Sequence, residues 1–197
     1  MTQRRSRSCA QRGFTLIETM IAIVILSIGI LSLVAVFGTA VASTENAQEN
    51  LIARQKALEA VESIFTARNT QQITFARIAN TASGGIFTNG PTPLWSAGND
   101  GLVNTSDDVP FPANGVCPAG SECIALPGPD GILGTADDTP MSLANFTREI
   151  QISSVLEPDG VTINPNLKQI TVTVSYTAGT STVPRSYSVN VLLSAFR

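Results

Sequence analysis

The 197-residue sequence contains no histidine, and only 14% of its residues are charged and 6% aromatic. The absence of histidine removes the most common general base, the most common zinc ligand and every Ser–His or Cys–His pair. With 12 basic against 15 acidic residues, the chain also lacks the basic excess of nucleic-acid-binding proteins. An enzyme would have to use carboxylates or lysine, and no nucleophile–base pair stands out. We therefore expect a non-enzymatic protein that does not bind nucleic acid.

Other absences are local and divide the chain into segments. None of the 11 prolines occurs before Pro91, and the 26 residues from 19 to 44 carry no charge. The four basic residues that precede Arg54 all lie within the first 12 positions. As a helix, the uncharged segment would be about 39 Å long, enough to cross a membrane core of about 30 Å. The positive-inside rule then predicts that residues 1–12 are cytoplasmic and that the rest of the chain lies outside.

One acidic residue, Glu18, lies at the mouth of the apolar segment. A carboxylate in this position costs a few kcal/mol unless it reaches the membrane surface or is paired with a cation. No basic side chain follows it until Arg54. Two interpretations are therefore open. Glu18 either reaches the interface, or it is neutralised by a new amino group formed by cleavage of the chain just upstream.

Residues 13–18 read Gly-Phe-Thr-Leu-Ile-Glu, after a short basic leader and before the apolar segment. This arrangement resembles the class III signal peptide of type IV pilins. The resemblance implies that prepilin peptidase cuts after Gly13 and methylates the new amine of Phe14. It also implies that Glu18 neutralises the Phe14 amine of a neighbouring subunit, an ion pair that fixes axial register while adding little net stability. Cleavage would remove four of the 12 basic residues and leave all 15 acidic ones.

The same resemblance implies partners and a location. The partners would be other pilin subunits, prepilin peptidase, the inner-membrane assembly platform and membrane lipid. The chain would lie in the inner membrane with a single span, and later in a pilus or pseudopilus in the periplasm or at the cell surface. The run at 25–31 and the absence of proline from the apolar helix resemble minor pilins, which initiate assembly or act at the tip in adhesion. A type II secretion pseudopilin is the alternative.

A second cleavage site competes with the first. Ala40-Val41-Ala42, followed by Ser43, fits the small-x-small rule of ordinary signal peptidase. Its use would release a soluble, secreted calcium-binding domain. The length of the apolar segment and the position of Glu18 inside the signal favour cleavage after Gly13.

The remaining pattern predicts an α+β fold. The helix is expected to continue to about residue 68, with Leu51, Leu58, Val61 and Phe65 on a stripe that packs against a sheet. Ala47 and Arg54 lie on the same stripe. Alternating apolar and polar residues predict antiparallel strands near 146–152, 170–176 and 183–191. The expected organisation is a leader (1–13), a transmembrane or filament-core helix (14–44), an amphipathic helix (45–70), a loop-rich region (71–145) and an antiparallel sheet (146–197).

The loop-rich region contains an internal repeat. Residues 98–110 read GNDGLVNTSDDVP and residues 128–140 read GPDGILGTADDTP, identical at seven of 13 positions. Carboxylates bunched on a tight loop are ligands that calcium prefers. The candidate ligands are Asp100, Asp107 and Asp108 in the first copy, and Asp130, Asp137 and Asp138 in the second. The spacing is not that of an EF-hand. The alternative is a pair of Asp-Gly turns on an acidic surface.

Two cysteines, Cys117 and Cys123, lie between the two copies, and the third, Cys9, lies in the leader. Removal of the leader would leave an even pair on the oxidising side of the membrane, where disulfides form. We expect a Cys117–Cys123 disulfide. Two free thiols or half of a metal site are the alternatives.

Overall fold

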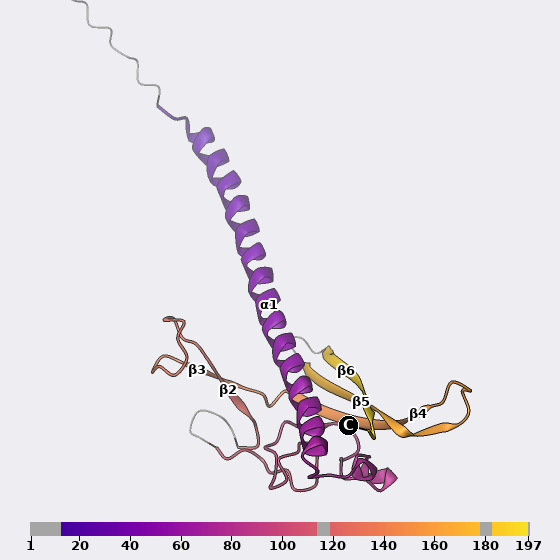
Figure 1. The fold of residues 1–197 in the computed structure, drawn as a ribbon. Helices are drawn as coiled ribbons and strands as arrows, with labels where there is room; N and C mark the ends of the chain where they lie inside the picture. The colour runs from indigo at the N-terminus through magenta and orange to yellow at the C-terminus, as the bar shows by residue number, and fades with distance from the viewer. Residues whose placement is uncertain (1–12, 114–118, 178–182, 197) are drawn as a thin grey trace, which may run out of the picture. The chain divides into compact units, whose positions relative to one another are not determined.

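The computed structural model describes residues 13–113, 119–177 and 183–196. The leader up to residue 12, Cys117 and the expected turn at 178–182 lie outside these described residues. The chain divides into two compact units at Thr44/Glu45. The first unit is the apolar part of helix α1, which runs from Leu16 to Asn69 (Figure 1). No described residue of this unit is buried.

The second unit contains the sheet that the sequence predicts. Strands β1 (Thr92–Pro93), β4 (Phe146–Leu156), β5 (Ile163–Thr177) and β6 (Pro184–Ser194) form an antiparallel sheet in the order β1-β4-β5-β6. In register, Ile150 lies beside Val172, which lies beside Val189. The α+β fold class is confirmed. Both long strands of the β4–β5 hairpin extend several residues beyond the predicted bounds, with a bulge between Ser154 and Val155.

The remaining elements are short. Two 3-10 turns, η1 (Phe75–Arg77) and η2 (Thr81–Ser83), follow α1. Strands β2 (Cys123–Leu126) and β3 (Thr139–Ser142) form a separate antiparallel hairpin inside the region expected to be loops. Its strand signals are weak because each strand has only four residues and β3 contains Pro140.

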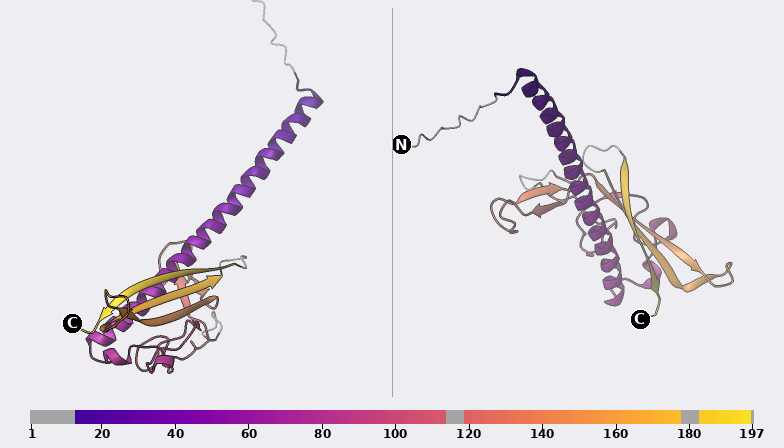
Figure 2. Two further views of the ribbon diagram at one scale, coloured as in Figure 1. Left: turned by 90° about the vertical axis from the view of Figure 1, so that its right-hand side faces the viewer. Right: turned by 90° about the horizontal axis from the view of Figure 1, so that it is seen from above.

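The C-terminal part of α1 crosses strands β4–β6, with which it forms the core (Figure 2). The inner face of β5 alternates as predicted, with Ile170, Val172, Val174 and Tyr176 buried. Tyr176 also stacks on Phe146, with ring centroids 5.2 Å apart. Burial of each aliphatic side chain is worth about 1.5–3 kcal/mol, so this face accounts for much of the stability of the unit.

The helix face predicted to pack on this sheet is partly wrong: Val61 and Phe65 pack against the core, but the other two apolar residues of the predicted stripe do not. Leu51 is 63% exposed and Leu58 is 44% exposed, and Arg54 is also exposed. Half of the eight buried residues on the face that packs are alanines: Glu49, Ile52, Ala53, Lys56, Ala57, Ala60, Ile64 and Ala67. Alanines let a helix backbone approach a sheet closely, whereas two leucines at Leu51 and Leu58 would hold it away. Leu51 and Leu58 are left on the outside, whereas Ile52 and Ile64 are buried.

Helix α1 ends where the backbone adopts a left-handed conformation. Gln71 has a left-handed φ of 64°, in a position where glycine is more usual. The N–H of Gln72 then donates to the Ala67 carbonyl at 2.9 Å, and Thr70 closes on Thr66. The chain thereby leaves the helix close to the predicted end.

Candidate functional site

The first turn of α1 places Glu18. The Thr15 hydroxyl accepts a hydrogen bond from the Glu18 backbone N–H at 3.3 Å, so Thr15 is the N-cap of the helix and Glu18 its third residue. Thr and Glu at this spacing are the sequence signature of a capping box, a signal that the charge pattern alone does not reveal. A carboxylate in the first turn is also favoured by the helix dipole. Among the described residues, the Glu18 side chain has no ion-pair partner.

Five hydroxyl side chains of the apolar segment are satisfied within the helix. The hydroxyls of Thr19, Ser27, Ser32, Thr39 and Thr44 each donate to a backbone carbonyl three or four residues earlier, at 2.7–3.0 Å. Such internal bonds suit a helix that water does not surround. By length and composition, α1 is the one helix among the described residues that could cross a membrane, and its most apolar window is unburied in the structure.

The sequence repeat folds into two loops with the same internal bonding. We call residues 98–110 loop 1 and residues 128–140 loop 2. In loop 1, the N–H of Asp100 donates to Asp107 Oδ2 at 3.3 Å, the N–H of Leu102 donates to Asp100 Oδ1 at 2.8 Å, and the N–H of Asn104 donates to Asp108 Oδ2 at 2.7 Å. The three carboxylates that were expected to bind calcium thus hold the backbone of their own loop.

Loop 2 repeats these three bonds at the equivalent positions. The N–H groups of Asp130, Ile132 and Gly134 donate to Asp137 Oδ2, Asp130 Oδ1 and Asp138 Oδ2 at 3.2, 2.8 and 2.7 Å. The first glycine of each copy is required for the same reason. A Cβ added at Gly98 would overlap Asp107, and one added at Gly128 would overlap Asp137.

The hydroxyl at the centre of each loop differs in its partners. Thr105 donates to Asp107 Oδ1 at 2.7 Å and lies 3.0 Å from Asp108 Oδ1. The Thr135 hydroxyl lies 2.6 Å from Asp137 Oδ1, as in loop 1. Its second partner is the carbonyl of Ile132, whereas the second partner of Thr105 is the aspartate equivalent to Asp138. Asp138 Oδ1 is therefore buried without a hydrogen-bond partner.

The carboxyl pKa values follow this bonding. The Thr105 hydroxyl, with the N–H of Asp100, lowers the pKa of Asp107 below its ordinary value. The Thr135 hydroxyl and the N–H of Asp130 do the same for Asp137. Burial instead raises the pKa of Asp108, against the opposing effect of Thr105 and the nearby Arg148. The equivalent residues Asp107 and Asp137 thus both have a lowered pKa and stay ionised to a lower pH than an ordinary aspartate.

The central residues of loop 1 are buried, and those of loop 2 are not. Leu102 is 1% exposed, and Val103, Asn104 and Thr105 are buried with it. In loop 2, the equivalents of Leu102 and Val103 are Ile132 and Leu133, and they are 61% and 63% exposed. The sequence repeat predicts the shared bonding but gives no sign of this difference.

A buried polar cluster, which sequence reasoning missed, fixes loop 1 to the sheet. Asn104 donates to the Thr92 hydroxyl at 2.7 Å and to the Arg148 carbonyl at 2.8 Å, and it accepts from Arg148 Nε at 2.7 Å. Burial lowers the pKa of the Arg148 guanidinium, while the nearby charges of Glu59, Asp108 and Glu122 act in the opposite direction. The alternation of β4 indicates that Arg148 faces inward, and this was the only available signal.

A second group of charged side chains links α1 to the residue before the β2–β3 hairpin. Lys56 of α1 is buried and pairs with Glu59 at 2.8 Å and with Glu122 at 2.5 Å. Glu122 directly precedes Cys123, which is disulfide-bonded. The expected partner, Cys117, lies outside the described residues, so the Cys117–Cys123 pairing stays a prediction.

No group of three or more His, Cys, Asp or Glu side chains among the described residues is arranged to hold a metal ion. Each of the six aspartates of loops 1 and 2 directs one carboxylate oxygen at a backbone N–H group of its own loop. The structure therefore lends no support to calcium binding. Calcium at these loops stays a prediction of the sequence.

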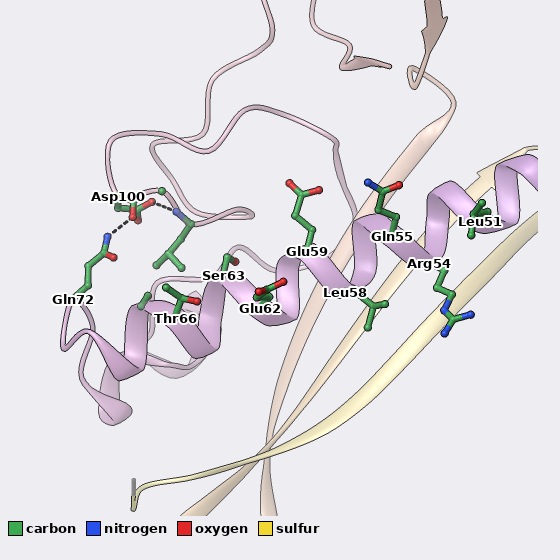
Figure 3. A pocket seen from close by; sticks show the side chains of 13 residues that line it. Leu51, Arg54, Gln55, Leu58, Glu59, Glu62, Ser63, Thr66, Gln72 and Asp100 are labelled. Carbon is green, nitrogen blue, oxygen red and sulfur yellow. Dashed lines mark hydrogen bonds between the residues drawn. The ribbon is translucent and has the colours of Figure 1, made fainter. Parts of the chain in front are cut away.

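A groove with a volume of about 860 Å³ runs along the outer side of α1 within the second unit (Figure 3). Loop 1 lines one end of it through Asp100, Gly101 and Leu102, and Gln72 donates a hydrogen bond to the Asp100 carbonyl there. The helix residues Leu51, Arg54, Gln55 and Leu58 line the other end. Arg54 and Leu58 point to the same side of the helix (Figure 3).

Comparison with known families supports the N-terminal part of this description. A family model described as the prokaryotic N-terminal methylation motif matches residues 9–34. The chain thus carries the class III signal peptide of type IV pilins on a long apolar helix. This supports a pilin- or pseudopilin-like protein that is processed as a prepilin. No curated protein and no solved structure matches the chain.

Proposed function

We propose that the chain is a minor type IV pilin, which prepilin peptidase cleaves after Gly13 and which is then incorporated into a pilus. Its role would be to initiate assembly or to act at the tip in adhesion, without enzymatic activity. Three observations support this proposal: the methylation motif, the exposed apolar part of α1, and an α+β unit whose sheet packs on the second part of the helix. The absence of proline from the apolar segment favours a minor subunit.

The observation that carries the proposal is the position of Glu18. It is a carboxylate in the first turn of an unburied apolar helix, and it has no ion-pair partner in the described part of its own chain. Inside a bundle of such helices it would need a cation. The amine of Phe14 on a neighbouring subunit, freed by cleavage, is the cation that the motif implies.

The intact mass and the N-terminus of the protein from membranes and sheared filaments test the cleavage site. A chain that begins with methylated Phe14 is the expected product. A chain that begins with Ser43 would contradict the proposal and would indicate a secreted domain.

Substitution of Glu18 tests the assembly role. We expect Glu18→Ala to leave cleavage intact and to reduce incorporation about tenfold or more, since a buried charge that loses its partner costs about 3–5 kcal/mol. Glu45→Ala is the matched control, because Glu45 is an exposed acidic residue of the same helix outside the apolar segment. Equal incorporation of the two variants, measured by immunoblot of sheared filaments, would contradict the role of Glu18.

A type II secretion pseudopilin would share the same processing, and deletion of either assembly system separates the two. Loss of the chain from the surface only when the secretion system is deleted would favour the pseudopilin.

Calcium binding by loops 1 and 2 is a separate proposal, supported by the repeated pattern of three aspartates. Calorimetric titration of the purified chain with calcium should give a saturable heat that Asp137→Asn and Asp138→Asn weaken. A titration that gives no calcium-dependent heat would contradict the proposal that these loops bind calcium.

A further inference from the structure

The β2–β3 hairpin is joined to the rest of its unit by few bonds. It forms a two-stranded sheet of its own, which shares no ladder with the sheet of β1, β4, β5 and β6. Ile124 and Met141 are only partly buried where they meet the core. At its base, the N–H of Leu143 donates to the Glu122 carbonyl at 2.8 Å. Because a short two-stranded hairpin is marginally stable by itself in water, its position depends on constraints at this base.

The Glu122 side chain supplies one such constraint. Its carboxylate accepts a hydrogen bond from Lys56 Nζ at 2.5 Å, and Glu59 accepts from the same atom at 2.8 Å. The side chains of Lys56 and Glu122 are only 9% and 20% exposed. Burial disfavours the charged form of Lys56, but the hydrogen bonds to Glu122 and Glu59 outweigh burial and raise the pKa of Lys56. A buried ammonium of this kind is tolerated only while its partners stay in place.

The residue after Glu122 supplies a covalent constraint. Cys123, the first residue of β2, is disulfide-bonded. A disulfide restricts the freedom of the backbone to which it is attached, and Glu122 is the adjacent residue. Glu122 is thus held by a backbone bond to Leu143, by an ion pair with Lys56 and by the covalent bond at the next position. Of these three, only the disulfide is made or broken by a change of redox compartment.

We propose that the disulfide at Cys123 is a redox-dependent clasp for the β2–β3 hairpin. While the bond is intact, it holds the Glu122 carboxylate on Lys56 and so fixes the hairpin against α1. When the bond is reduced, Glu122 moves away, and Lys56 turns to solvent because a buried ammonium with one carboxylate removed is costly. The inference rests on the proposed function in one respect, namely that the unit is exported to the oxidising side of the membrane. The hairpin, with loop 2 at its end, is then fixed only after export.

The redox step is a thiol–disulfide exchange. When the bond forms, two cysteine thiols give two protons and two electrons to the disulfide of a protein oxidant, which becomes a dithiol. In the reverse step, a thiolate of an added dithiol attacks one sulfur, releases one cysteine thiol and forms a mixed disulfide with the other. The second thiol of the reagent then displaces that sulfur. The reagent leaves as its own disulfide, and the protein keeps two thiols.

Acylation of lysine amines, measured by mass spectrometry of peptides, tests the clasp. The chain has two lysines, and Lys168 is an internal reference because its bonds, to the carbonyls of Phe75 and Ile78, do not involve the hairpin. The full-length chain, with Cys9→Ser to remove the thiol of the leader, is acylated before and after reduction with dithiothreitol. We expect reduction to speed acylation of Lys56 about tenfold or more, as a buried amine is released, and to change Lys168 about twofold or less.

Two outcomes of this experiment would contradict the clasp. Equal acylation rates for Lys56 in the oxidised and reduced chains would overturn it, because the amine would then be held without the disulfide. A parallel rise at Lys56 and Lys168 would also overturn it, because reduction would then loosen the whole unit and not one contact.

Substitution of Glu122 shows whether the disulfide acts through this residue. In the oxidised chain, Glu122→Gln should speed Lys56 acylation about as much as reduction does, and reduction of the variant should add about twofold or less. Glu149→Gln is the matched control, because Glu149 is a partly buried glutamate of β4 with no ion pair among the described residues. It should keep the full response of Lys56 to reduction. An undiminished response in Glu122→Gln would overturn the proposal.

Hydrogen–deuterium exchange of the hairpin amides is a readout that does not depend on the lysine amine. Reduction should speed exchange over residues 123–126 and 139–142 about tenfold. Lys56→Met, which replaces the ammonium by an apolar side chain, should speed exchange similarly while the disulfide is intact, and reduction should then add little. If reduction speeds exchange equally in Lys56→Met and in the parent chain, the disulfide does not act through Lys56 and the clasp is overturned.

Failure of the clasp is distinguishable from failure of the proposed function. The acylation and exchange experiments use the purified chain, so they do not depend on cleavage or filament assembly. A methylated Phe14 start and Glu18-dependent incorporation, with Lys56 indifferent to reduction, would overturn the clasp alone. A Ser43 start with redox-dependent acylation of Lys56 would overturn the pilin proposal and keep the clasp, because both products reach the oxidising side of the membrane.

Discussion

Loops 1 and 2 compare one short sequence in two surroundings. Each loop anchors its own backbone through the same three aspartates, so its conformation is decided locally. Burial is decided elsewhere. Loop 1 has Asn104 where loop 2 has Gly134, and only Asn104 can reach Arg148 on the sheet. The comparison teaches that a repeat in sequence predicts a repeat in local structure but not a repeat in role.

The largest difference between the loops should come from this one position. Asn104→Ala removes the acceptor of the buried Arg148 Nε and places alanine at a φ of 61°. We expect a loss of about 3 kcal/mol in the free energy of unfolding, because a buried donor on a charged group loses its acceptor and because alanine is strained in the left-handed region. Gly134→Ala, at a φ of 91°, should cost about 1–2 kcal/mol through backbone strain. Urea unfolding measures both, and equal losses would mean that the Asn104 cluster does not anchor loop 1.

The aliphatic pair should give the next largest difference. Leu102→Ala creates a cavity in the core and should cost about 2–5 kcal/mol. Ile132→Ala, at the equivalent exposed position, should change the free energy of unfolding by about 0.5 kcal/mol or less. Thermal unfolding of the dilute purified chain measures this comparison. A large loss for Ile132→Ala in the monomer would show that loop 2 packs on its own chain.

The smallest difference concerns titration. Asp107 and Asp137 have folded pKa values below the ordinary 3.8, so each stabilises its loop above that value, and the effect is lost as the pH falls through the folded pKa. Asp108 has a raised pKa, and its protonation at falling pH relieves a burial penalty. We expect carboxyl NMR titrations in which Asp107 and Asp137 each have a midpoint below that of Asp108. A common midpoint for Asp107 and Asp108 would contradict this order.

The sheet could be predicted because its strands alternate clearly. Ile170, Val172 and Val174 on β5 are buried, as the period of two indicates. The four-residue strands β2 and β3 could not be found, because they pair only with each other and show no such period. The Asp residues of the repeat could be identified from the sequence. The hydrogen bonds that they accept from backbone N–H groups could not, because a pattern of side chains does not predict such bonds.

The helix face failed for a different reason. Sequence reasoning placed Leu51, Leu58, Val61 and Phe65 against the sheet, and of these only Val61 and Phe65 pack against the core. The residues buried at the other positions include Ala53, Ala57 and Ala60. Periodicity identifies the faces of a helix, but the space between helix and sheet decides which of them is used. That space depends on how closely the helix backbone approaches the sheet, and the amino-acid pattern does not predict this distance.

The alanine face of α1 has a consequence for how the protein can change over time. Because Ala53, Ala57 and Ala60 pack the helix against the sheet, the exposed side chains of Leu51 and Leu58 are not needed for this packing. Substitutions on the outer face can therefore accumulate without harming the stability of the domain. Such a helix can acquire a new set of neighbours while its own architecture stays the same.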